Sequence, residues 1–122
     1  MNPDTRILII DDEPILRESL QAWLERDGYS IEAVSSGEEG LERVKETSFD
    51  LLFLDLKLED IDGIQVLSRV KEDDPDTAVV MITAYGSVPS AVEAMKQGAE
   101  DYLLKPFEPE ELSLLIEKIL SH

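Results

Sequence analysis

The chain has 122 residues, 43% of them hydrophobic, so it is long enough for one domain with its own core and too short for a second. Its 28 acidic and 11 basic residues give a formal net charge of −17, which repels nucleic-acid phosphates and argues against direct DNA or RNA binding. The absence of cysteine excludes disulfides and thiolate metal sites, and no apolar stretch approaches the roughly 20 residues that a membrane-spanning helix needs.

The first residues, from Met1 to Arg6, lack the basic and then apolar layout of a signal peptide, so we expect a soluble cytoplasmic protein. Beyond them, five short apolar runs alternate with five stretches of helical periodicity. The apolar runs are residues 7–10, 30–34, 51–54, 78–82 and 102–104. Strands separated by single helices imply right-handed crossovers, and therefore a parallel sheet with helices on both faces.

Each helical stretch carries residues that are typical of a helix start or end. In chain order these residues are Pro14 and Gly28, Ser36 with Glu39, Asp62 with Gly63, Pro89 and Gly98, and Pro109. Ser36 and Glu39 have the spacing of a capping box, in which each side chain accepts a hydrogen bond from the other residue's backbone. The pattern predicts five helices with well-defined boundaries.

Five strand–helix units of this size predict an α/β fold, a flavodoxin-like (βα)5 doubly wound parallel sheet with strand order 2-1-3-4-5. The run at 30–34 alternates polar and apolar side chains, as a half-exposed edge strand does, and it ends in the uncharged Ser35 and Ser36. In this order the topology reverses between the first and third strands. A ligand crevice is expected there, beyond the carboxyl ends of the strands.

Residues able to handle a phosphoryl group follow three of the apolar runs. Asp11 and Asp12 follow the first run, Asp55 the third and Lys105 the fifth. Because the carboxyl ends of parallel strands lie along one edge of the sheet, these side chains should meet in one place.

Three carboxylates in one crevice repel each other unless a cation joins them. A small number of hard oxygen ligands is typical of a Mg²⁺ site. The ion would neutralise an incoming phosphoryl group and let one carboxylate act as a nucleophile. Asp55 is the best nucleophile candidate because it ends the most central strand.

Each of these residues also has a purely structural interpretation. An Asp after a strand is often a helix cap, Thr83 could be a β-branched strand residue, Lys105 a solvated lysine and Tyr102 a core aromatic. Taken singly, these interpretations are at least as good as the functional ones. They weaken together, because four strands would all have to place phosphate-handling groups at their carboxyl ends by chance.

The chain resembles the receiver domains of two-component response regulators from Ile7 to about Leu120, and residues 1–122 are expected to form one such domain. The motifs that carry the resemblance are Asp11-Asp12, Asp55, Thr83-Ala84 and Lys105-Pro106-Phe107. The resemblance implies that Asp55 is the phosphoacceptor, with a sensor histidine kinase or a phosphotransfer protein as donor. It also implies a Mg²⁺ site, which could take Mn²⁺, formed by Asp12, Asp55 and the backbone carbonyl of Lys57, with Asp11 acting through metal-bound water.

The same resemblance gives phosphoryl-binding roles to Thr83, Ala84 and Lys105, and it implies a cis peptide bond between Lys105 and Pro106. Thr83 and Tyr102 match the family's switch pair, in which the phosphoryl group draws the threonine hydroxyl inward and the tyrosine turns into the vacated space. That change would remodel the surface of the fourth helix, fifth strand and fifth helix. Partners, or a second copy of the chain in a phosphorylation-dependent homodimer, would dock there.

Residues 82–102 are similar to one subgroup, the NtrC-type receivers, which normally precede an ATPase domain that activates sigma-54 RNA polymerase. This similarity implies a transcriptional output and either an isolated receiver or a piece of a longer regulator whose output domain lies elsewhere. Lys57 and Tyr85 lie two residues beyond Asp55 and Thr83, at positions where receivers vary, and flank the path of water to the acyl phosphate. We predict that they tune the lifetime of the phosphorylated state.

Two other classes stay open. A phosphohydrolase of the haloacid dehalogenase type also uses an Asp nucleophile and Mg²⁺, but it needs a second acid two residues later, where this chain has Lys57. A flavodoxin-like docking module without phosphorylation is the other alternative. A flavin carrier would need a phosphate-cradling loop after the first strand, whereas the loop Asp11-Asp12-Glu13-Pro14 would repel a phosphate unless a metal intervenes. A receiver, by contrast, is not an enzyme and assists only its own phosphorylation and dephosphorylation.

Overall fold

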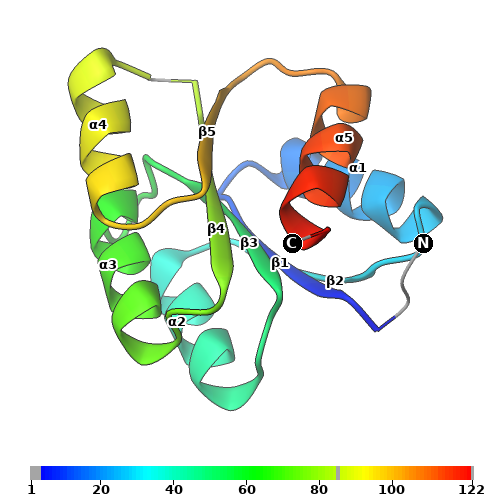
Figure 1. The fold of residues 1–122 in the computed structure, drawn as a ribbon, viewed down its shortest axis with the longest axis horizontal. Helices are drawn as coiled ribbons and strands as arrows, with labels where there is room; N and C mark the ends of the chain where they lie inside the picture. The colour runs from blue at the N-terminus through cyan, green and yellow to red at the C-terminus, as the bar shows by residue number, and fades with distance from the viewer. Residues whose placement is uncertain (1–3, 85, 122) are drawn as a thin grey trace.

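The computed structural model describes residues 4–84 and 86–121, which form a five-stranded parallel sheet of order β2-β1-β3-β4-β5 flanked by five helices (Figure 1). The strands are β1 (Arg6–Ile10), β2 (Ser30–Val34), β3 (Leu51–Asp55), β4 (Ala78–Thr83) and β5 (Asp101–Leu104). The helices are α1 (Pro14–Arg26), α2 (Gly37–Glu46), α3 (Gly63–Asp73), α4 (Val88–Lys96) and α5 (Pro109–Leu120). The predicted flavodoxin-like fold and strand order are confirmed. None of the described helices is long and apolar enough to cross a membrane.

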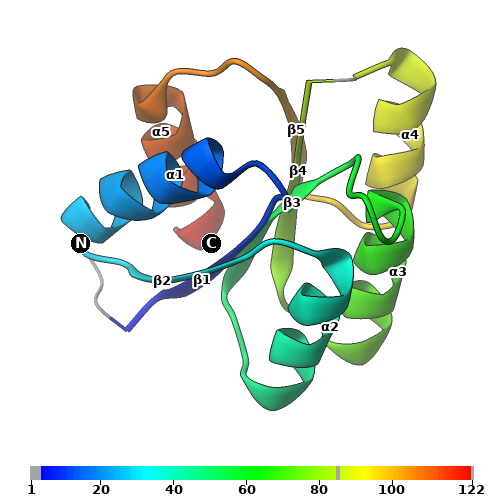
Figure 2. The ribbon, with the colours of Figure 1, turned by 180° about the vertical axis from the view of Figure 1, so that it is seen from behind.

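The helices form two layers. Figures 1 and 2 show α1 and α5 on one face of the sheet and α2, α3 and α4 on the other. Because successive strand side chains point to opposite faces, each layer has its own buried cluster. The cluster under α1 and α5 includes Ile7, Ile9, Phe53, Val80, Leu24 and Ile116. The cluster under the other layer includes Leu8, Ile10, Leu54, Met81, Leu67 and Val70.

The central strands align their carboxyl ends. Ile10 of β1 is paired with Leu54 of β3, and Asp55 of β3 is paired with Ile82 of β4. At the next boundary, the Lys105 amide donates a hydrogen bond to the Thr83 carbonyl at 2.8 Å. The register therefore brings the residues that follow β1, β3, β4 and β5 to one edge of the sheet.

The helix boundaries agree closely with the start and end residues predicted from the sequence. Gly28 and Gly98 follow α1 and α4 in the left-handed region, with φ of 96° and 103°, where glycine is favoured. The Ser36 hydroxyl accepts a hydrogen bond from the Glu39 amide at 3.2 Å, which is one of the two hydrogen bonds of the predicted capping box. The Glu39 carboxylate accepts from the hydroxyls of Ser35 and Ser36, at 2.9 and 3.2 Å.

Helix α4 differs from the other helices in what it exposes. Its apolar residues Val88, Val92 and Met95, which have helical spacing in the sequence, are 78%, 47% and 48% exposed. Among the residues of α4, all of which the structure describes, Ala94 alone is buried. The neighbouring edge strand β5 exposes Leu104 as well. Large apolar side chains are therefore exposed both on α4 and on the edge strand of the sheet.

Candidate functional site

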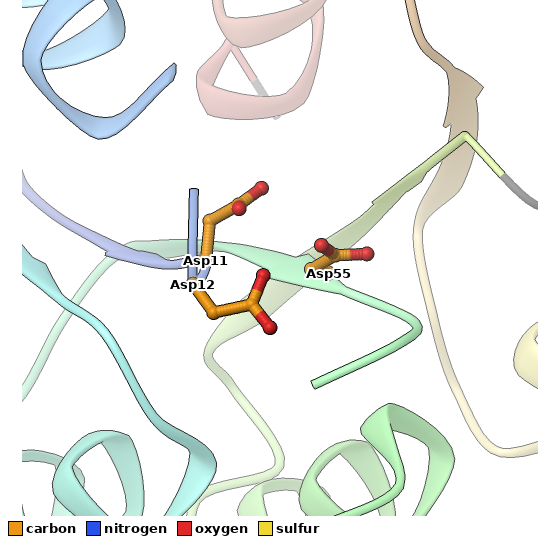
Figure 3. A group of neighbouring side chains, drawn as sticks. All are labelled: Asp11, Asp12 and Asp55. Atoms are coloured by element: carbon orange, nitrogen blue, oxygen red, sulfur yellow. The ribbon is translucent and has the colours of Figure 1, made fainter. Parts of the chain in front are cut away.

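Three carboxylates gather at the carboxyl ends of β1 and β3 (Figure 3). Asp11, Asp12 and Asp55 each offer an oxygen, and these oxygens all lie within 4.8 Å of one another. Asp11 is fully buried and Asp55 is 4% exposed, whereas Asp12 is half-buried. Carboxylate oxygens in small number are the donors that Mg²⁺ and Mn²⁺ prefer, so these residues fit a hard divalent cation.

Lys105 crosses the crevice from the end of β5. Its Nζ atom donates to Asp11 Oδ2 at 2.8 Å, to Asp55 Oδ2 at 3.3 Å and to Glu13 Oε2 at 3.3 Å. Burial alone would lower the pKa of Lys105, but the hydrogen bond to Asp11 and the charges of Asp11, Asp55 and Glu13 raise it above its ordinary value. The ammonium group therefore stays charged. The peptide bond between Lys105 and Pro106 is cis.

Asp55 carries an electrostatic cost in this position. Burial, together with the charge of Asp11, raises the pKa of Asp55, while the Lys57 amide and Lys105 act in the opposite direction without cancelling the effect. The ionised form is therefore disfavoured relative to water. Additional positive charge in the crevice, from a divalent cation, would favour the ionised carboxylate.

Backbone and side-chain hydrogen bonds hold the acids in place. The Glu13 amide donates to Asp11 Oδ1 at 2.8 Å, and the Lys57 amide donates to Asp55 Oδ1 at 3.1 Å. Arg17, on α1, donates to the Asp11 backbone carbonyl at 2.7 Å. Glu13 and Arg17 are not among the predicted site residues. Glu13 is the third acid in a row after β1, which is a usable signal, whereas no local pattern identifies Arg17.

A cleft of about 400 Å³ opens beside the acids. Its lining residues are Asp12, Glu13, Asp55, Lys57, Leu58, Glu59, Ala84 and Lys105. Thr83, the last residue of β4, is fully buried next to Ala84. Tyr85, which the sequence placed on the water path, lies outside the described residues. The cleft thus contains predicted metal-binding and phosphoryl-binding residues from the ends of four strands, β1, β3, β4 and β5.

Tyr102 is the second residue of β5, and its side chain contacts α4. Its hydroxyl is 2.9 Å from the Ser90 hydroxyl, within hydrogen-bond distance. A Cβ atom on Gly86 would lie 3.3 Å from the Tyr102 hydroxyl, so the side chain lies against the loop between β4 and α4. Ser90 is not among the predicted site residues, because its partner comes from a different element.

Comparison with known proteins decides the family. The response regulator receiver domain family matches residues 7–117. The chain belongs to this family. The receiver prediction is therefore confirmed, and the chain is a phosphoacceptor signalling domain and not a catalytic enzyme. The phosphohydrolase alternative is wrong.

Similar proteins agree with this assignment. The transcriptional regulatory protein ZraR of Escherichia coli is 42% identical over 116 residues, which is 95% of this chain and 26% of ZraR. The transcriptional regulatory protein ResD of Bacillus subtilis is 36% identical over 96% of this chain and 48% of ResD. The chain thus spans about a quarter to a half of the length of these relatives.

Among solved structures, a CheY-like response regulator receiver domain protein from Methanospirillum hungatei superimposes with a TM-score of 0.94. It is 32% identical, and the match covers 96% of this chain and 94% of that protein. The similarity therefore extends across nearly the whole of both folds.

Proposed function

We propose that residues 1–122 act as one receiver domain that accepts a phosphoryl group on Asp55. The donor is the phosphohistidine of a sensor histidine kinase or of a phosphotransfer protein. The observation that carries this proposal is the nearly buried Asp55 carboxylate, hydrogen-bonded to Lys105 at 3.3 Å beside two further carboxylates. An Asp55 oxygen bonds to phosphorus as the bond from phosphorus to the donor imidazole breaks. The imidazole keeps the bonding electron pair, and the product on Asp55 is an acyl phosphate.

The proposed metal site uses the carboxylates of Asp12 and Asp55 and the backbone carbonyl of Lys57, with Asp11 acting through bound water. Bound Mg²⁺, or Mn²⁺ in its place, supplies the positive charge that lets a phosphoryl group approach three acids. The raised pKa of Asp55 supports this role, because a bound cation would favour the ionised carboxylate that burial and Asp11 disfavour.

We assign binding of the phosphoryl oxygens to Thr83, Ala84 and Lys105. In the structure, the Lys105 ammonium is already bonded to Asp11 and Asp55, so it needs only a short movement to pair with a phosphoryl group on Asp55. Charge-assisted hydrogen bonds of this kind are stronger than neutral ones and would draw the Thr83 hydroxyl toward the crevice.

Thr83 and Tyr102 form the switch in this proposal. When Thr83 moves inward, Tyr102 turns, and the surface of α4, β5 and α5 changes. That surface would bind an output partner or a second copy of the chain in a phosphorylation-dependent homodimer. The exposed Val88, Val92 and Met95 support the placement, because they provide apolar area for docking.

The proposed output is control of transcription by a longer regulator acting in the cytoplasm. The names of ZraR and ResD as transcriptional regulatory proteins support it, as does the share of their length that this chain spans. The similarity to ZraR also supports the narrower likeness to NtrC-type receivers.

The test is the intact mass of the protein after incubation with acetyl phosphate and Mg²⁺. We expect one added phosphoryl group on the wild type, lost at alkaline pH as an acyl phosphate is, and none on Asp55→Asn or without divalent metal. A folded protein that binds Mg²⁺ but gains no mass in any condition would overturn the proposal. It would favour a docking module that uses the same pocket without phosphorylation.

A further inference from the structure

The loop between β3 and α3, residues 56–62, is fastened to the start of α2 by one carboxylate. Asp60 Oδ1 accepts a hydrogen bond from the Gly37 amide at 3.0 Å, and Asp60 Oδ2 accepts one from the Glu38 amide at 2.9 Å. These are first-turn amides of α2, which have no partner within the helix. Asp60 thus caps α2 from 22 and 23 residues farther along the chain.

Ser36, the local cap of α2, binds different amides. Its hydroxyl accepts from the Glu39 amide and its carbonyl from the Gly40 amide. The four amides at the start of α2 are therefore divided between a local residue and Asp60. The Asp60 carboxylate is needed to complete the cap, and its negative charge also interacts favourably with the helix N-terminus.

Apolar contacts hold the same loop against the same helix. A Cβ atom on Gly37 would lie 3.3 Å from Leu58 Cδ1 and 3.4 Å from Ile61 Cβ, so the loop rests directly on this glycine. Leu58 and Ile61 are partly buried against the core beneath α2 and α3. Asp60 lies between these two anchors in sequence and supplies the polar contact.

The other end of the loop lies in the crevice. The Lys57 amide donates to Asp55 Oδ1 at 3.1 Å, and Lys57 lines the cleft beside Asp12 and Asp55. The backbones of Lys57 and Asp62 also form an isolated antiparallel β-bridge across the base of the loop. Only two residues separate Lys57 from Asp60, so fixing Asp60 on α2 restricts where the Lys57 peptide group can lie.

We propose that Asp60 is a positioning residue of the metal site, which holds the loop so that the Lys57 peptide group is in place before Mg²⁺ binds. The inference rests on the proposed function, in which the Lys57 carbonyl is a ligand. Asp60 itself touches neither the metal nor the phosphoryl group. Without its hydrogen bonds, metal binding must order the loop, and the lost conformational entropy weakens the affinity for Mg²⁺. Once the site is filled, phosphorylation proceeds at nearly the wild-type rate.

The test compares Asp60→Ala, Asp60→Asn and Glu38→Ala in the full chain. Glu38→Ala is the matched control, since it removes one negative charge at the same first turn of α2 that Asp60 caps, but leaves the backbone amide that binds Asp60. Mg²⁺ is titrated by calorimetry without a phosphodonor, and amide hydrogen exchange at Lys57 is measured without metal. Initial rates with acetyl phosphate are then recorded across a Mg²⁺ series.

We expect Asp60→Ala to weaken Mg²⁺ binding about tenfold or more, as removal of an outer-shell partner typically does. The rate at saturating Mg²⁺ should stay within about twofold of the wild type, so that the defect lies in binding and not in the chemical step. Exchange at Lys57 should become faster in the metal-free protein. Asp60→Asn keeps one acceptor oxygen and should fall between the wild type and Asp60→Ala. Glu38→Ala should resemble the wild type.

Unchanged Mg²⁺ affinity in Asp60→Ala overturns the inference, as does an equal loss in Glu38→Ala, because charge alone would then explain it. If loss of the cap prevents Asp60→Ala from folding, Asp60→Asn decides on the same criteria. A wild type that binds Mg²⁺ yet takes up no phosphoryl group refutes the phosphoacceptor role and leaves the titration a valid test of Asp60. A wild type that binds no Mg²⁺ refutes both.

Discussion

Helices α3 and α4 pack on the same face of the sheet but are held very differently (Figure 1). Helix α3 buries Gly63, Val66, Leu67 and Val70, whereas α4 buries Ala94 alone. The loop leading into α3 is anchored as well, because Gly63 lies so close to the Leu56 backbone that a Cβ atom would come within 2.7 Å of it. The contrast indicates that the crevice is built on a rigid part of the molecule and that α4 is attached more weakly.

The polar contacts at the starts of α3 and α4 differ in the same way. At the start of α3, Asp62 accepts from the Ile64 amide at 2.9 Å within a loop that is already packed on α2. At the start of α4, Ser87 and Ser90 cap each other, and Ser90 also meets Tyr102 of β5. Elements with few buried contacts open at lower free energy than packed ones. A switch that must respond to one phosphoryl group is expected to use the weakly packed element.

The largest expected effect tests this difference in packing directly. Leu67→Ala in α3 should lower the free energy of unfolding by about 2–5 kcal/mol, because it leaves a cavity in a fully buried site. Met95→Ala in α4 should change it by less than about 0.5 kcal/mol, since that side chain is 48% exposed. Urea unfolding of both variants provides the measurement. Similar losses in the two variants would show that α4 is packed as firmly as α3.

Much of the fold was predictable because its signals are local. The continuous apolar runs of β1, β3 and β4 identified strands buried on both faces, and the end signals at Pro14 and Gly28 located α1. The weak packing of α4 was not predictable. Val88, Val92 and Met95 have the spacing of a helix whether or not a neighbour covers them, and only the tertiary structure shows that they are exposed.

The candidate site was likewise predictable only where its sequence signals are local. Asp11, Asp12, Asp55 and Lys105 were found because each lies at the carboxyl end of a strand or just beyond it, and the sheet order then brings them together. Residues that act across elements gave no such signal. Asp60 reaches α2 and Ser90 reaches β5. Both look like ordinary loop or helix-start residues in the sequence, because the partner that gives them a role is distant along the chain.

The second prediction concerns the loss of folding stability caused by burying the Asp55 carboxylate in the crevice. The pKa of Asp55 is raised by burial and by Asp11, so between its ordinary and its raised value the folded state binds more protons than the unfolded state. Stability therefore falls as pH rises through this window, and the loss persists at neutral pH. Asp55→Asn should raise the melting temperature of the metal-free protein at pH 7, and the gain should shrink as pH falls into the window.

The exposed Asp76 provides the control, because Asp76→Asn removes the same charge from the surface. Calorimetric melting at several pH values, with a chelator present, makes the comparison. A gain of equal size in Asp76→Asn would mean that the lower net charge of the whole chain, which is −17 in the wild type, explains the effect. Removal of the buried Asp55 carboxylate would then not be the cause. Added Mg²⁺ should stabilise the wild type more than Asp55→Asn, because it binds the folded site that the substitution weakens.

The smallest effect concerns the contact that ties α4 to β5. Tyr102→Phe should cost about 0.5–1.5 kcal/mol, the usual range for one hydrogen bond. Ser90→Ala should cost more, because the Ser90 hydroxyl also accepts from the Ser87 amide at 3.1 Å in the cap of α4. If the two hydroxyls are bonded, the double variant should lose less than the sum of the single losses, by about the energy of that bond.

Urea unfolding of the two single variants and the double variant gives this coupling energy, and hydrogen exchange along α4 shows where the loss acts. Strictly additive losses would mean that Tyr102 does not hold α4, and turning Tyr102 would then have no direct means of moving that helix. A measurable coupling, with faster exchange in α4 and unchanged exchange in α3, would identify one hydrogen bond as the link between Tyr102 and α4. Because that link is worth little energy, a single phosphoryl group at the crevice would suffice to break it.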